Sequence, residues 1–198
     1  MIQLTETEIS NRLHEIQSAT STDGYTQGNT GASKSAAVLV PLLRQDNEWH
    51  LLYTRRTDQV ESHKGQVSFP GGASNDGETS PEQTALREAQ EEIGIDPRGV
   101  RLLGRLNSML TITSYHVTPV VGVIPWPTVF RPEQAEVARI FTMPLTWLAE
   151  RSNRWEFNML GRDYSVIVYH PFDGETLWGA TARMTVDFLE ILSPSLRA

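Results

Sequence analysis

Residues 72–95 constrain the fold of this chain most strongly, because they contain a helix whose two ends are both marked in the sequence. Ser80 is suited to the N-cap position, a proline follows it at the first helical position, and Gln83 has the spacing of a capping box. Gly94 is suited to the left-handed residue that follows a last helical turn. The sequence therefore predicts a helix over Pro81–Ile93, entered from a polar loop that follows a Gly-Gly pair.

Three glutamates of this predicted helix fall on one side of it. An α-helix turns by about 100° per residue, so Glu88, Glu91 and Glu92 share an arc of roughly 100°. Such carboxylates repel one another unless a cation lies among them, and crowded hard oxygen ligands suit Mg²⁺ or Mn²⁺. Arg87 precedes Glu91 by four residues and can pair with it. The neighbouring apolar face, which we expect to pack on a sheet, consists of Ala85, Leu86, Ala89 and Ile93.

A solvated acidic helix face is the alternative interpretation, and it is the usual one for a bare Glu-Glu pair. Here the Gly-Gly turn, the polar loop and the order Arg-Glu…Glu-Glu-x-Gly occur together. That combination is much rarer than any of its parts, and it favours a metal site.

The rest of the chain alternates between short strand-like segments and a few helical ones. We expect strands at residues 36–43, 49–54, 66–69, 100–106, 115–124, 137–143, 155–160 and 164–169, and helices at residues 5–17, 145–150 and 178–192. The last two strands should pair as a hairpin, and the last helix should bury Ala182, Val186, Leu189 and Leu192. This pattern predicts an α+β protein in which a mixed sheet packs against a few helices.

The chain divides by composition near residue 35. Residues 18–35 consist almost wholly of small and polar residues, which cannot form a core. We therefore expect an N-terminal part, residues 1–35, with a short helix and a flexible polar segment. The compact domain should occupy residues 36–198.

Charge and composition exclude several classes of protein. The 17 basic and 24 acidic residues give a net charge of −7, which disfavours nucleic-acid binding and implies that an anionic substrate needs local cations. The sequence contains no Cys, so a disulfide, a thiol nucleophile and a Cys-based zinc site are impossible. Neither a signal peptide nor a membrane-spanning run is present in the pattern, and we expect a cytoplasmic protein, either a monomer or a homodimer.

The acidic segment resembles the Nudix box, in which a Gly, five residues, a Glu and seven residues precede Arg-Glu-apolar-x-Glu-Glu-x-Gly-apolar. Its places are filled here by Gly72, Glu78, Arg87, Glu88, Ala89, Glu91, Glu92, Gly94 and Ile95. One departure is that eight residues, not seven, separate Glu78 from Arg87. The extra residue falls in the loop or at the helix start, where an insertion costs little.

The resemblance implies a fold, a reaction and a set of roles. The fold is an α/β/α sandwich in which the box forms a loop–helix–loop motif beside a mixed sheet. The reaction is metal-dependent hydrolysis of a pyrophosphate. Glu88 and Glu92 would be the principal metal ligands, Glu91 would share the metals or help to activate water, and Arg87 would hold the carboxylates in register. The carbonyl of Gly72 would offer a further ligand.

Residues before the box resemble the coenzyme A pyrophosphatase branch of the same family. Its signature runs Leu-Leu-Thr-x-Arg-small, then a spacer with an Arg, then Gly-x-Val-x-Phe-Pro-Gly-Gly. The matching residues here are Leu52, Thr54, Arg56, Gly65, Val67, Phe69, Pro70, Gly71 and Gly72, whereas Glu61 replaces the spacer Arg. This branch implies cleavage of coenzyme A into phosphopantetheine and adenosine 3′,5′-bisphosphate.

The local cations that could contact the phosphates of such a substrate are Arg55, Arg56, His63 and Lys64. Each has an alternative interpretation as a surface charge at a strand end. Glu136 resembles a Nudix position near the catalytic loop and has two interpretations, a further metal ligand or a solvated turn. Two other functions stay open: hydrolysis of ADP-ribose, NADH or a nucleoside triphosphate, and a non-catalytic Nudix module that senses a nucleotide.

Overall fold

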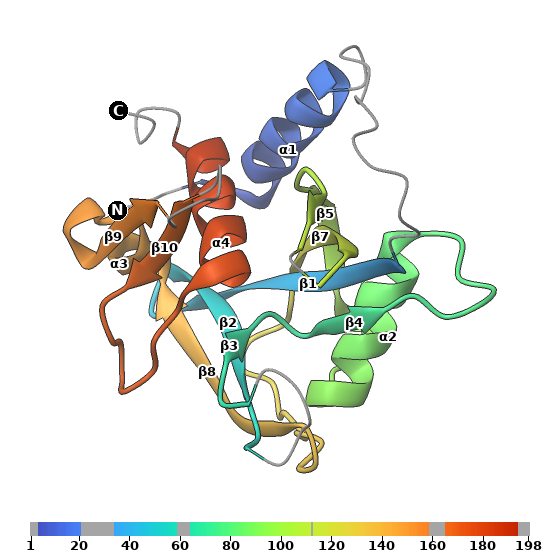
Figure 1. The fold of residues 1–198 in the computed structure, drawn as a ribbon. Helices are drawn as coiled ribbons and strands as arrows, with labels where there is room; N and C mark the ends of the chain where they lie inside the picture. The colour runs from blue at the N-terminus through green and yellow to red at the C-terminus, as the bar shows by residue number, and fades with distance from the viewer. Residues whose placement is uncertain (1–3, 21–33, 59–63, 112, 159–164, 194–198) are drawn as a thin grey trace.

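A computed structural model of the chain describes residues 4–20, 34–58, 64–111, 113–158 and 165–193 (Figure 1). The helices are α1 (Glu6–Thr20), α2 (Pro81–Ile93), α3 (Leu145–Ala149) and α4 (Gly179–Leu192), with single 3₁₀ turns at Pro97–Gly99 and Arg151–Asn153. The strands are β1 (Lys34–Gln45), β2 (Glu48–Arg56), β3 (Val67–Ser68), β4 (Gly71–Ala73), β5 (Arg101–Arg105), β6 (Met109–Leu110), β7 (Tyr115–Val123), β8 (Val137–Pro144), β9 (Arg154–Asn158) and β10 (Ser165–Tyr169).

The main sheet is mixed, as the sequence predicts. Its strand order is β3-β2-β1-β7-β5, while β8 pairs with β2, β4 with β1 and β6 with β7. Strands β1 and β7 run parallel, and the other pairs are antiparallel. Asp46 and Asn47 join β1 to β2 with φ values of 50° and 62°, the conformation of a two-residue hairpin turn. Strands β9 and β10 form the predicted hairpin as a separate two-stranded sheet, and its predicted tip lies outside the described residues.

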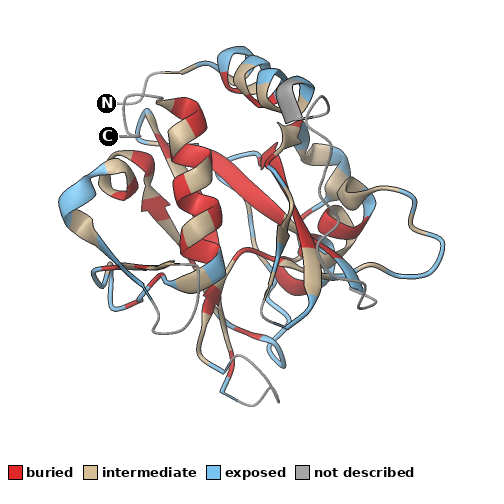
Figure 2. Ribbon diagram, turned by 45° about the horizontal axis from the view of Figure 1, so that its top comes forward, coloured by how far each residue is buried: buried red, intermediate tan, exposed pale blue. Residues whose placement is uncertain are grey.

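Helices cover both faces of the sheet, which confirms the α/β/α sandwich. Alternate residues of β1 point to opposite faces: Leu39 joins the core under α2, whereas Val40 joins the core under α1, α3 and α4. Figure 2 shows that burial is concentrated in the strands and on the sheet-facing sides of the helices. The four residues that the sequence assigns to the buried side of α4 are all buried: Ala182, Val186, Leu189 and Leu192.

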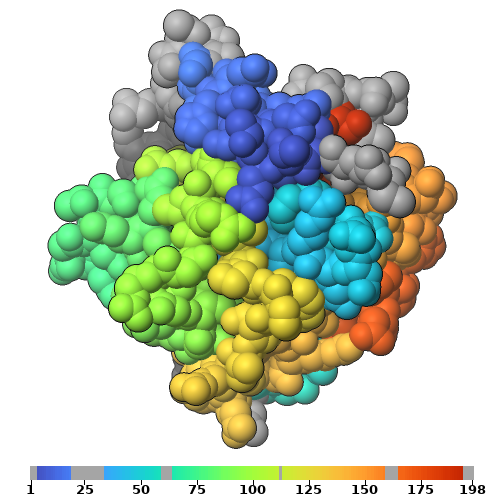
Figure 3. All heavy atoms as spheres, turned by 180° about the vertical axis from the view of Figure 1, so that it is seen from behind, coloured from blue at the N-terminus to red at the C-terminus, as the bar shows by residue number. Residues whose placement is uncertain are grey.

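Helix α1 packs into the same core as the chain that follows residue 35. Ile9 and Leu13 are fully buried, and the indole of Trp49 donates a 2.8 Å hydrogen bond to the carbonyl of Leu4. Gly104 lies beneath this helix, where an added Cβ would be 2.9 Å from the Cβ of Leu13. Figure 3, which views the protein from behind, shows α1 packed against the rest of the chain. Helix α1, which precedes the predicted boundary at residue 35, therefore packs into the same core as the strands that follow that boundary.

Two short strands, β4 and β6, were not predicted, because three residues and two residues carry too little pattern of their own. Helix α1 also continues to Thr20, past its predicted end. Among the described residues no helix is long and apolar enough to cross a membrane.

Candidate active site

Helix α2 spans the predicted residues, and its two ends are fixed by local hydrogen bonds. The hydroxyl of Ser80 accepts a 3.4 Å hydrogen bond from the backbone N–H of Gln83. The side chain of Gln83 reaches back to the backbone N–H of Thr79 at 2.7 Å, one residue earlier than a capping box predicts. Gly94 ends the helix with φ 70°. These caps fix where the helix begins and ends. The packing of Ala85, Ala89 and Ile93 against the sheet sets its rotation, which places Glu88 and Glu92 beside β4.

The Gly71-Gly72 pair allows β4 to approach both β1 and the helix. Gly71 pairs with Val38, and a Cβ on Gly71 would be 2.6 Å from the Cα of that residue. A Cβ on Gly72 would instead be 2.6 Å from the carboxylate of Glu88. One glycine thus permits the close pairing of two strands, and the other leaves space for a predicted metal ligand.

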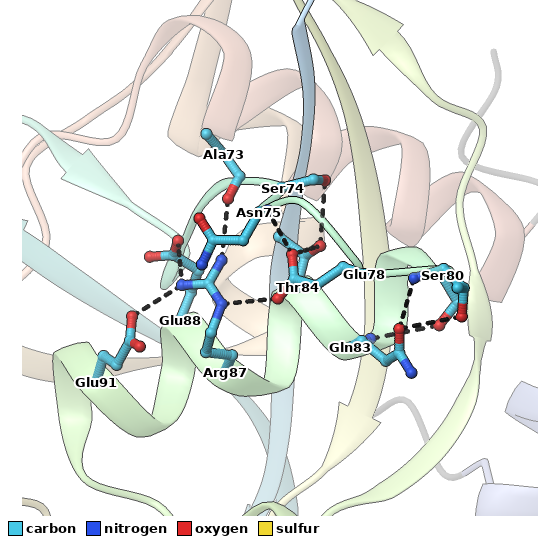
Figure 4. A network of polar contacts seen from close by, with 11 residues as sticks. Ala73, Ser74, Asn75, Glu78, Ser80, Gln83, Thr84, Arg87, Glu88 and Glu91 are labelled. Carbon is cyan, nitrogen blue, oxygen red and sulfur yellow. Dashed lines mark hydrogen bonds and ion pairs between the residues drawn. The ribbon is translucent and has the colours of Figure 1, made fainter.

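Arg87 lies at the centre of a network of carboxylates (Figure 4). Its guanidinium donates hydrogen bonds to Glu78 at 2.7 Å and to Glu88 and Glu91, each at 2.8 Å. It also donates a 3.0 Å bond to the carbonyl of Ala73. The predicted pairing of Arg87 with Glu91 is present, and one arginine connects the helix to the loop.

Glu78 closes this loop in spite of the extra residue before α2. Its carboxylate accepts hydrogen bonds from Arg87, from the hydroxyl of Thr84 at 2.7 Å and from the backbone N–H of Asn75 at 2.8 Å. The bond from Arg87 is the largest cause that lowers the pKa of Glu78 to about 2. The inserted residue therefore leaves the contact between Glu78 and Arg87 intact.

Glu92 is the most buried glutamate of α2, with 5% of its surface exposed. It accepts a 3.3 Å hydrogen bond from the backbone N–H of Gly71, and its carboxylate lies 3.6 Å from the guanidinium of Arg56. Burial raises the pKa of Glu92 to about 8, and the charge of Arg56 partly opposes this rise. By contrast, the side chain of Glu91 is 59% exposed.

Arg56 is the predicted substrate-binding residue that lies against the acidic helix. Its guanidinium is also 4.0 Å from the carboxylate of Glu136, on the segment before β8. Arg55, the preceding residue, pairs instead with Asp58 at 3.7 Å and Glu175 at 3.9 Å.

The remaining predicted cations do not extend the cluster of charges around Glu92. Lys64 is exposed in the turn before β3. His63 and Glu61 lie outside the described residues. Of the three predicted cations that the structure describes, Arg56 is the one that lies against the carboxylates of α2.

The oxygen atoms around Gly72 have the chemistry that Mg²⁺ and Mn²⁺ prefer. Glu88, Glu91 and Glu92 supply carboxylate oxygens from one rigid helix, and the missing side chain of Gly72 leaves room for the first of them. Within the described ranges, no three acidic or histidine side chains converge as a ligand set. Instead, Arg87 holds Glu88 and Glu91, whereas Arg56 faces Glu92. The donors fit a hard divalent cation, and arginines occupy them here.

Three contacts of this site were missed by the sequence reasoning. Thr84 donates its hydroxyl and Asn75 its backbone N–H to Glu78. The polar side chain of Thr84 near the helix start was the available signal for the first contact, whereas a backbone donor leaves no signal in the sequence. The approach of Arg56 to Glu92 had no local signal, because it depends on the tertiary packing of β2 beside α2.

Comparison with known proteins agrees with this architecture. A family model described as the NUDIX domain matches residues 33–160. Relatives named "Uncharacterized Nudix hydrolase NudL", from Escherichia coli strain K12 and Shigella boydii serotype 18, are each 39% identical over 145 residues. That alignment covers 73% of this chain and 70% of each relative.

Solved structures share the fold at lower identity. A MutT/nudix family protein from Enterococcus faecalis superposes with a TM-score of 0.54 at 15% identity, over 92% of this chain and 71% of the other. The MutT protein from Methanosarcina mazei Go1 gives a TM-score of 0.51 at 20% identity, over 85% of this chain and all of the other. These likenesses show the arrangement of sheet and helices.

Proposed function

The chain belongs to the Nudix hydrolase family, and on that premise we propose that it hydrolyses the pyrophosphate bond of coenzyme A or a derivative, releasing phosphopantetheine and adenosine 3′,5′-bisphosphate. Membership of this family identifies the chain as a pyrophosphohydrolase. The proposal adds the substrate, the metal and the residues that act.

One observation carries the assignment of the site. Glu88, Glu91 and Glu92 all project from α2, with Glu88 beside Gly72 and Glu92 beside Gly71, and two arginines neutralise them. A purely solvated acidic face would not need a glycine beneath one carboxylate or the burial of another. These features support a site that holds cations against an anionic substrate.

The metal residues in this proposal are Glu88, Glu91 and Glu92, with the carbonyl of Gly72, and the cofactor is Mg²⁺ or Mn²⁺. When bound, such ions neutralise the phosphate oxygens and lower the pKa of a coordinated water. The protein's own part is to position the carboxylates. Arg87 and Glu78 fix Glu88 and Glu91 against the loop, and burial restricts water around Glu92.

Coenzyme A is favoured by the residues that lead into the site. The signature begins at Leu52 within β2, includes β3, and ends at the Gly-Gly pair beside α2. Arg56 stands at the end of β2, next to Glu92, where a cation can meet a diphosphate. Coenzyme A also carries a 3′-phosphate, for which Arg55, His63 and Lys64 are the proposed cations.

The substrate is tested by incubating purified protein with Mg²⁺ or Mn²⁺ and separate samples of coenzyme A, acyl-coenzyme A, ADP-ribose, NADH and nucleoside triphosphates. Products are identified by mass spectrometry. Phosphopantetheine formed from coenzyme A supports the proposal. A preference for ADP-ribose overturns it and points to Glu61 as the reason, and absence of product from every compound favours a sensing module.

Glu92→Gln tests the role of the helix. We predict that this variant keeps the fold and loses turnover by about 100-fold or more, because a neutral amide is a poor ligand for a hard cation. Glu82→Gln is the matched control, since Glu82 lies on the same helix and pairs with Arg105. Turnover is measured with metal in excess, and a wild-type rate in Glu92→Gln would refute the assignment.

A further inference from the structure

We propose that Arg56 is a placeholder for the metal: its guanidinium neutralises Glu92 and Glu136 in the metal-free protein, and it turns toward the substrate diphosphate when a divalent cation takes its place. This inference rests on the proposed function. It assigns Arg56 two alternating partners, whereas the sequence suggests only a substrate contact.

The end of β2 is built so that Arg56 faces the helix. Strand β2 pairs with β8 in regular register as far as Arg55, opposite Arg139, and the register then shifts so that Arg56 is opposite Val137. A bulge of this kind re-aims the side chains beside it. Successive residues of a strand point to opposite faces, and here Arg55 faces Glu175 whereas Arg56 faces Glu92.

When Glu92 is ionised and no metal is bound, its carboxylate needs a positive partner. Glu92 is 5% exposed, and among the described residues its carboxylate also accepts a hydrogen bond from the backbone N–H of Gly71. A buried carboxylate without a counterion is strongly destabilising. Arg56 supplies that counterion through Nη1, and Glu136 brings a second negative charge near Nη2 of the same guanidinium.

The two arginines of the site differ in how tightly they are held. Arg87 makes four hydrogen bonds of 2.7–3.0 Å, which is the geometry of a permanent support. Arg56 lies 3.6 and 4.0 Å from its two carboxylates, beyond hydrogen-bond distance. Its Nε is buried and has no hydrogen-bond partner in the part of the chain that the structure describes. The contacts of Arg56 are therefore electrostatic and exchangeable.

A divalent cation bound to Glu92 would repel the Arg56 guanidinium, which lies 3.6 Å from the same carboxylate and, within the described ranges, has no hydrogen bond to hold it there. The guanidinium is thus the group that leaves when a metal ion binds to Glu92. Its planar set of N–H donors matches phosphate oxygens, so a displaced Arg56 can contact the substrate held at the same place. One side chain then stabilises the empty site and binds the substrate in the loaded one.

The test compares wild type, Arg56→Gln and Arg56→Lys by calorimetric titration with Mn²⁺, in the absence of nucleotide, and by thermal melting in EDTA and in saturating Mn²⁺. We expect Arg56→Gln to bind Mn²⁺ several-fold more tightly, because a competing cation is gone. Its melting temperature should fall in EDTA and approach that of wild type in Mn²⁺. Arg56→Lys should restore both properties toward wild type.

Arg55→Gln is the matched control, since it removes the same charge one residue away and faces Glu175. Its Mn²⁺ affinity should equal that of wild type. The inference is overturned if Arg56→Gln binds Mn²⁺ as wild type does, or if its melting temperature falls equally in EDTA and in Mn²⁺. Failure of the wild-type protein to bind Mn²⁺ would instead overturn the proposed function on which the inference rests.

Discussion

At the scale of residues, Gly71 and Gly72 are neighbours in sequence, but an added side chain meets a different obstacle at each. At Gly71 the obstacle is backbone, with the carbonyl oxygen of Ala37 2.5 Å from the ideal Cβ position. At Gly72 it is the far end of the Glu88 side chain. A side chain can move aside more easily than a paired strand, so the two glycines serve stability and function separately.

This difference predicts opposite outcomes for two single-methyl substitutions. Gly71→Ala should lower the free energy of unfolding by about 2–3 kcal/mol or more, because strand β1 has to shift. Gly72→Ala should melt close to wild type and lose at least about 10-fold in activity, because Glu88 is displaced. Denaturant unfolding and turnover measured on both variants check this. Equal loss of stability in the two variants would contradict the proposed role of Gly72.

Glu78 predicts a dependence of stability on acid. Hydrogen bonds from Arg87, Thr84 and Asn75 lower its pKa to about 2 in the folded protein, below the ordinary value of 4.5. The folded state therefore binds this proton less readily than the unfolded chain. The stabilisation that results is fully present above pH 4.5 and is lost as the pH falls toward 2.

Glu78→Gln should therefore flatten the fall of melting temperature between about pH 5 and pH 2. The exposed Glu15 of α1 provides the control, because Glu15→Gln removes a carboxylate outside the Arg87 network. Melting curves recorded across this range by circular dichroism measure the effect. Parallel curves for wild type and Glu78→Gln would show that the network does not depend on the charge of Glu78.

At the scale of elements, α2 was predicted to its last residue because the signals for its ends are local. Ser80 and Gly94 act on the backbone within one turn, so their effect does not depend on the rest of the fold. Strand β4 was missed for the opposite reason, since its pairing is supplied by β1. The contact between Arg56 and Glu92 could not be predicted either, because it needs both the register shift of β2 and the packing of α2.

The C-terminal cap of α2 allows a test of whether its glycine is needed only for backbone conformation or also for packing against a distant segment. Gly94 and Gly77 both have positive φ, at 70° and 92°. An alanine at Gly77 meets nothing within 4 Å, whereas an alanine at Gly94 would be 2.7 Å from the Cβ of Arg131. Gly77→Ala should cost about 1 kcal/mol from backbone strain alone, and Gly94→Ala should cost about 1–3 kcal/mol more. Chemical denaturation measures the free energy of unfolding of both variants. Equal losses would contradict this prediction and would mean that the segment at Arg131 moves aside without cost.

At the scale of the whole molecule, one core on each face of the sheet holds the site in place. The mixed sheet and its helices were predicted from periodicity, and the buried residues of α4 were predicted individually. The membership of α1 in the core was not predicted, because the polar segment after it resembles a boundary. Sequence composition can mark where a core is interrupted, but it does not tell whether the chain returns to the same core.

Leu13→Ala tests whether α1 is part of the folding unit. Leu13 is fully buried against Gly104, and its truncation should cost about 2–4 kcal/mol and lower the melting temperature by about 5–15 °C. Leu110, which is 60% exposed, provides the matched control in Leu110→Ala. If Leu13→Ala melts as wild type does, the helix is an appendage and the boundary at residue 35 is structural.

The central claim is that the carboxylates of α2 hold divalent ions. Electron paramagnetic resonance of free Mn²⁺, recorded while protein is added, measures this directly and needs no substrate. The signal of free Mn²⁺ should fall with wild-type protein and with Glu82→Gln, and it should stay nearly unchanged with Glu92→Gln. Equal loss of the signal with Glu92→Gln and wild type, or no loss with either, would contradict the claim.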